Sequence, residues 1–123
     1  MKTAGWLVGH LAVTGDFGRK LCGRTPLCAS EWRAKFNPGT QPSFSRANYP
    51  SMAELRDAFQ AVYTDLCDAA LSADSAVLAR ENPFPPTRAS FPTSGDFVTY
   101  LLAGHLAYHI GQLQAWRSAS NAG

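Results

Sequence analysis

The three histidines of the chain, His10, His105 and His109, are the residues best suited to chemistry. His105 and His109 are four positions apart, so on an α-helix they lie about 40° apart around the axis and roughly 6 Å apart along it. Two imidazoles in this arrangement on one helical face can chelate a single ion. His10 falls on the apolar face of another predicted helix, from which it could add a third nitrogen. The pattern predicts one divalent transition-metal ion per chain.

The donor type narrows the choice of ion. Three neutral imidazoles suit Zn²⁺, Ni²⁺, Cu²⁺ or Fe²⁺, and the lack of carboxylates near these positions disfavours Mg²⁺ and Ca²⁺. Three protein ligands leave at least one coordination position for water or substrate, as in catalytic rather than structural sites. Buried histidines that only form hydrogen bonds with their neighbours would give the same spacing, and the spacing alone leaves this alternative open.

Two neighbouring side chains could support the histidines. Gln112 follows His105 by seven residues, within about 20° of it on the helical wheel, and Tyr108, next to His109, could donate a hydrogen bond. We find no obvious general base: Asp16, six residues after His10, is expected on the far side of that helix. No catalytic residue can be named from the sequence.

Three predicted helices must position these residues, near 4–22, 51–72 and 94–117. Apolar residues recur at helical spacing in the first two. The middle helix begins with a capping box formed by Ser51 and Glu54, and Ser94 is expected to cap the last one. The apolar stripes are Trp6, His10, Val13, Phe17 and Leu21, and then Met52, Leu55, Phe59, Val62, Leu66 and Ala69.

The segments between the helices, 23–50 and 73–93, are rich in proline and are expected to be irregular. A short helical turn is expected around 29–36, and the aromatic residues Trp32, Phe36 and Phe44 indicate that the first segment packs against the rest of the protein. No strand pattern competes with the helices. We therefore expect an all-α fold and a single domain over residues 1–123.

Composition excludes several classes of protein. The 123 residues carry 11 basic and 9 acidic side chains, a net charge of +2, without a basic cluster that would indicate nucleic acid or a membrane surface. The N-terminal apolar stretch, interrupted by polar residues, is neither a signal peptide nor a membrane span. The three cysteines, Cys22, Cys28 and Cys67, are expected to be free thiols. A cytoplasmic protein is expected.

Two sequence elements together resemble the DinB-like family of metal-binding helical bundles. The first is Gly5-Trp6-Leu7-Val8-Gly9-His10-Leu11-Ala12, and the second is Gly104-His105-Leu106-Ala107-Tyr108-His109-Ile110-Gly111-Gln112-Leu113. The resemblance spans nearly the whole chain. It implies an up-down four-helix bundle with nickel or zinc on three histidines, which here correspond to His10, His105 and His109.

The resemblance also implies, for some members, transfer of a low-molecular-weight thiol to an electrophile, or isomerisation assisted by such a thiol. Alternatives are a metal-dependent hydrolase and a non-catalytic or stress-related metal-binding bundle. Family members carry a helix before the tryptophan-bearing one, and this chain starts too late to include it. We expect either a truncated N-terminus or a bundle completed by another chain, and hence a homodimer, simple or domain-swapped.

Overall fold

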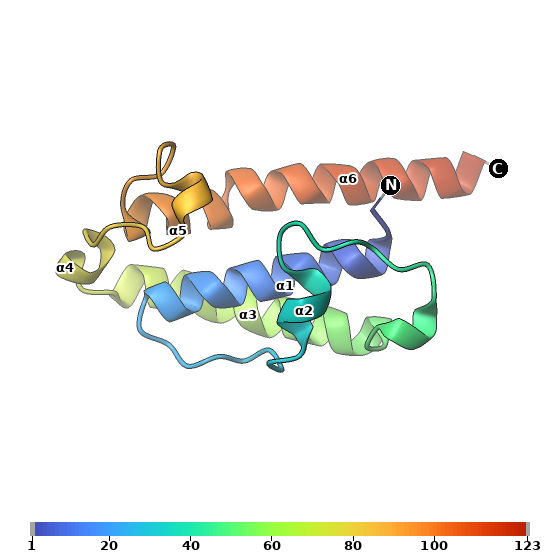
Figure 1. Ribbon diagram of the computed structural model, residues 1–123, viewed down its shortest axis with the longest axis horizontal. Helices are drawn as coiled ribbons and strands as arrows, with labels where there is room; N and C mark the ends of the chain where they lie inside the picture. Colours follow the sequence, from blue (N-terminus) through green and yellow to red (C-terminus); the bar gives the residue numbers. More distant parts are fainter. Residues whose placement is uncertain (1, 123) are drawn as a thin grey trace.

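Figure 1 shows the computed structural model, which describes residues 2–122. Three long helices run alongside one another: α1 (Ala4–Leu21), α3 (Met52–Ser72) and α6 (Gly104–Ala122). Within the described residues the only β-type pairing is an isolated bridge between Glu81 and Thr93. The all-α prediction is confirmed. The remaining elements are short: α2 (Trp32–Phe36), η1 (Arg46–Asn48), α4 (Ser75–Leu78), η2 (Pro85–Thr87) and α5 (Ser94–Leu102).

Helix α1 is the most enclosed element. The Thr3 side chain caps it by accepting a hydrogen bond from the backbone N–H of Trp6, and Gly23, at a φ of 91°, follows its end. Twelve of its 18 residues are buried, so nearly its whole circumference is covered. Its most extensive packing partner is α3, which begins at the predicted cap Ser51 and buries the apolar side chains Leu55, Val62, Leu66 and Ala69.

The predicted continuous helix over 94–117 is wrong, because the chain breaks it into α5 and α6. Ala103 has φ −119° and ψ −82°, outside the helical region, and the next residue, Gly104, has one of the lowest helix propensities. The cap of α5 is Thr93 rather than Ser94, and Thr93 forms a capping box with Asp96. Helix α6 extends beyond the predicted end, and its residues from Gln114 to Asn121 are exposed.

The first connection covers one side of α1. It contains the predicted helical turn as α2, and Phe36 is fully buried in a cluster with Trp6, Leu7, Val13 and Leu55. The expectation that Phe44 packs was wrong, since its side chain is 83% exposed. A single irregular segment therefore supplies one large core side chain against α1.

The second connection is held by one buried amide. Asn82 is completely buried and donates to the hydroxyl of Thr87 and the carbonyl of Phe91, while its Oδ1 accepts from the N–H of Phe84. Saturated hydrogen bonding of this kind makes burial of an amide tolerable. The loop is consequently fixed over α5, where Phe84 stacks on Phe97.

In the part of the chain that the structure describes, every helix is too short or too polar to cross a membrane.

Candidate metal centre

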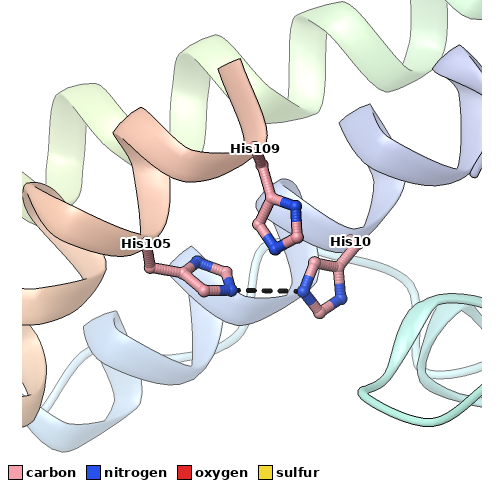
Figure 2. A group of neighbouring side chains, drawn as sticks. All are labelled: His10, His105 and His109. Atoms are coloured by element: carbon pink, nitrogen blue, oxygen red, sulfur yellow. Dashed lines mark hydrogen bonds between the residues drawn. The ribbon is translucent and has the colours of Figure 1, made fainter. Parts of the chain in front are cut away.

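The fold brings the three histidines together from two helices. Figure 2 shows His10 of α1 facing His105 and His109 of α6, with ring nitrogens directed at the space between them. The Nε2 atoms of His10 and His105 are 3.2 Å apart, and one nitrogen from each of the three rings lies within 4.8 Å of the others. This group could hold a metal ion.

His10 is oriented by two contacts that keep one nitrogen free. Its ring stacks on Trp6 with centroids 4.5 Å apart and planes 12° from parallel. Its Nδ1 donates a hydrogen bond of 2.7 Å to the backbone carbonyl of Phe36. Because a carbonyl can only accept, the proton of the neutral ring resides on Nδ1, and Nε2 keeps its lone pair. Backbone carbonyls commonly orient metal-binding histidines in this way.

His109 is oriented in the same manner by a side chain. Its Nδ1 lies 2.6 Å from Oε1 of Gln112, one helical turn further along α6, which leaves Nε2 free. Gln112 was expected in the register of His105, but its contact is with His109. Tyr108 lies beside the same ring, with centroids 5.1 Å apart, and is 64% exposed.

His105 lacks such a partner. Its side chain is 9% exposed, and the buried Nδ1 has no hydrogen bond within the described chain. If Nδ1 carries the proton, the Nε2 lone pairs of His105 and His10 face each other at 3.2 Å. An ion between them would remove this repulsion, and two nitrogens bound to one tetrahedral zinc are about 3.3 Å apart. The donor set and this spacing fit a transition metal.

All three imidazoles are held in the neutral form that binds metals. Burial lowers the pKa of His10 to about 4, against the opposing effect of the Phe36 carbonyl. Burial, with smaller contributions from His109 and His10, lowers the pKa of His105 to about 4. The pKa of His109 is also lowered, mainly by burial and despite the Gln112 contact. Lone pairs are therefore available at neutral pH.

The charge around the histidines is positive. Lys2 lies over the ring of Trp6 at 3.7 Å, and its field adds to the lowering of the pKa of His10 and His109. Asp16 is engaged elsewhere: it pairs with Arg19 at 2.7 Å and accepts from the N–H groups of Leu27 and Cys28. No carboxylate of the described residues contacts the three rings, which favours an anionic ligand at this site.

The sequence pattern identified the three histidines but not the groups that orient His10. Phe36 acts through its backbone, and no side-chain pattern signals a carbonyl 26 residues away. Stacking by Trp6 could have been inferred, because residues four apart on a helix are neighbours. The i, i+3 spacing of His109 and Gln112 likewise predicts their contact.

The family model of the DinB superfamily matches residues 1–113 of the chain. This match covers most of the sequence, including all three histidines, and agrees with the all-α fold. The chain belongs to the DinB superfamily. No curated protein and no solved structure shows a significant match.

Proposed function

We propose that the protein binds one divalent transition-metal ion, zinc or nickel, on His10, His105 and His109, and uses it to activate a low-molecular-weight thiol for transfer to an electrophile. The observation that carries the proposal is the cluster itself: three buried neutral imidazoles with donor nitrogens within 4.8 Å. When bound, such an ion would supply Lewis acidity that favours the ionised form of a thiol.

The surroundings support thiol activation over hydrolysis. A hydrolase usually needs a general base to handle protons, and the nearest α1 carboxylate in sequence, Asp16, is committed to Arg19 and two backbone N–H groups. The positive field of Lys2 favours a thiolate or another anion instead. Burial raises the pKa of the Cys28 thiol to about 12, so this cysteine stays protonated and a small-molecule thiol is the better nucleophile. A cytoplasmic location suits such a thiol.

Metal binding is tested first, on protein purified without a histidine tag. We expect one ion per chain in the wild type and none held stoichiometrically by His109→Ala. Full occupancy in that variant would rule out the assignment. Gln114→Ala, an exposed change on the same helix, is the matched control and should keep the ion.

Catalysis is tested on the loaded protein with a cellular thiol and an aryl halide electrophile. We expect thioether formation that depends on protein, metal and thiol together, and that is lost in His109→Ala. Stoichiometric metal without turnover of any thiol and electrophile pair would favour the non-catalytic alternative. Ester hydrolysis at similar rates with and without thiol would favour the hydrolase.

A further inference from the structure

A cavity of about 240 Å³ opens on the side of α1 that faces the first connection and α5. Its wall is built from these three parts of the chain and from Phe84 of the second connection, and its apolar residues include Val13, Phe17, Phe84, Phe97 and Leu101. Three of these rings pack on one another, with centroids 6.0 to 6.5 Å apart. The volume is just below the range of about 300–1,000 Å³ typical of ligand pockets, and so suits a molecule smaller than a drug.

None of the three histidines lines the cavity, but its wall contains residues next to those that carry or orient the rings. Thr14 in its wall is one turn after His10 on α1, and its hydroxyl donates to the His10 carbonyl. Leu101 of α5 is four residues before His105. Asn37 follows Phe36, whose carbonyl holds His10. One side of the cavity wall therefore lies next to the backbone that carries His10 and the carbonyl that orients it.

The polar part of the wall is cationic. Lys20 and Arg33 both line the cavity and are exposed, and no ion pair within the described residues involves either of them. Asp16, the acidic residue of the wall, is neutralised by Arg19. The two cations are thus free to pair with an anion that enters from solvent.

We infer that this cavity is the substrate pocket of the histidine site and takes a small carboxylate with an apolar body. Its carboxylate pairs with Lys20 and Arg33, and its body lies against the aromatic wall. The other end of the molecule points toward the histidines. Binding of the carboxylate depends on the cavity alone, whereas its role as substrate rests on the proposed function.

Binding is tested with three probes of equal size: 3-phenylpropionate, its uncharged amide and 3-phenylpropylamine. Ligand-observed NMR on the full chain should show that affinity decreases from the carboxylate to the amide to the amine. We expect the same order in metal-free and in zinc-loaded protein. The double variant Lys20→Gln, Arg33→Gln should bind the carboxylate roughly three- to tenfold more weakly, as expected for two exposed ion pairs, and should lose the preference over the amide. Arg56→Gln, on the exposed face of α3, should leave both the affinity for the carboxylate and its preference over the amide unchanged.

Location is tested by filling the cavity and by a paramagnetic ion. Ala29→Phe, at an exposed wall position, should block the carboxylate while leaving metal stoichiometry intact. Co²⁺ at the histidines should speed relaxation of the bound probe protons relative to Zn²⁺. If the probes bind but the chain takes no metal, the proposed function fails and the carboxylate site stands. If metal binds while the probes do not discriminate by charge, or show no cobalt effect, the pocket is overturned.

Discussion

The backbone carbonyl of Phe36 accepts the Nδ1 proton of His10 over 2.7 Å, although the two residues are 26 positions apart. This contact sets the tautomer of His10 and so decides which nitrogen is free. It relies on a close approach between the Phe36 ring and α1 at Gly9, where an added Cβ would lie 2.5 to 2.6 Å from three ring atoms. Phe36, which is not a candidate ligand, therefore controls the geometry of His10, which is a candidate ligand.

Gly9→Ala should disturb the histidine cluster from outside it. The methyl group must displace the fully buried Phe36 ring, and overpacking of this kind costs about 1–3 kcal/mol of stability. We expect the free energy of unfolding to fall by that amount and metal affinity to fall with it, since the Phe36 carbonyl moves. Chemical denaturation and metal titration measure the two effects.

Gly111→Ala is the matched control for this change. Gly111 lies on α6 between His109 and Gln112, and nothing lies within 4 Å of an added Cβ. The substitution should raise stability by about 0.4–1 kcal/mol by reducing the entropy of the unfolded chain. A loss of metal affinity in Gly111→Ala as large as in Gly9→Ala would show that the Phe36 contact has no special role.

Gln112→Ala should weaken metal binding without removing a ligand. The amide holds Nδ1 of His109 at 2.6 Å, and loss of such orienting partners commonly lowers metal affinity 10- to 100-fold. Competition titration with a chromogenic chelator measures the change, and Gln114→Ala provides the control. Equal affinities in the two variants would mean that His109 is oriented by packing alone.

Removing the metal should lower the melting temperature but leave the helices in place. The apolar contacts between α1 and α3 need no ion, so metal adds only the stabilisation that ligand binding gives to a folded state. Circular dichroism of chelator-treated protein should keep its helical signal. An unfolded metal-free chain would assign the histidines a structural role.

The metal-free protein should lose stability as the pH falls from about 6.5 to about 4. His10 and His105 have pKa values of about 4 when folded and about 6.5 when unfolded, mainly because of burial. The unfolded chain therefore binds more protons in this window, and the loss is at most about 3 kcal/mol for each histidine, at about 1.4 kcal/mol per pKa unit. Chemical denaturation at each pH, with a chelator present, measures this loss of stability.

His105→Asn isolates the contribution of this histidine to the pH dependence of stability. The variant should show a smaller drop in stability than the wild type between pH 6.5 and 5. Parallel curves for the two proteins would contradict burial of a neutral His105.

We propose a homodimer formed through α6. This helix contacts α1 and α5 but leaves Tyr108 and Trp116 exposed by 64% and 39%, and these two residues lie within about 80° of each other around the helix axis. A second copy related by a two-fold axis could cover the same patch on both chains. Sedimentation should give a dimer at micromolar concentration, which Trp116→Glu disrupts and Leu71→Glu, at an exposed position on α3, does not. A monomeric wild-type protein would contradict the proposed dimer, because it would show that α6 needs no second copy to cover it.

Apolar periodicity was enough to predict α1 and α3, and the four-residue spacing of His105 and His109 was enough to place these two rings on one face of a helix. Apolar periodicity could not predict which segment of the chain covers the apolar face of a helix. Phe36 lies in an irregular connection, and its burial beside Gly9 depends on contacts distant in sequence. The break at Ala103 was missed for a related reason. A glycine inside a helical pattern is often tolerated, and tertiary packing decides whether the helix bends or ends there.

The two helices that carry the histidines differ in how firmly they are held. Helix α1 is covered almost all round, whereas α6 is open to solvent from Gln114 to Asn121. Amide hydrogens of α1 should thus exchange only when the whole chain unfolds, and those of α6 through smaller local openings. An ion bound between them could leave whenever α6 opens, so its residence time would follow the opening rate of α6 rather than the unfolding rate of the protein.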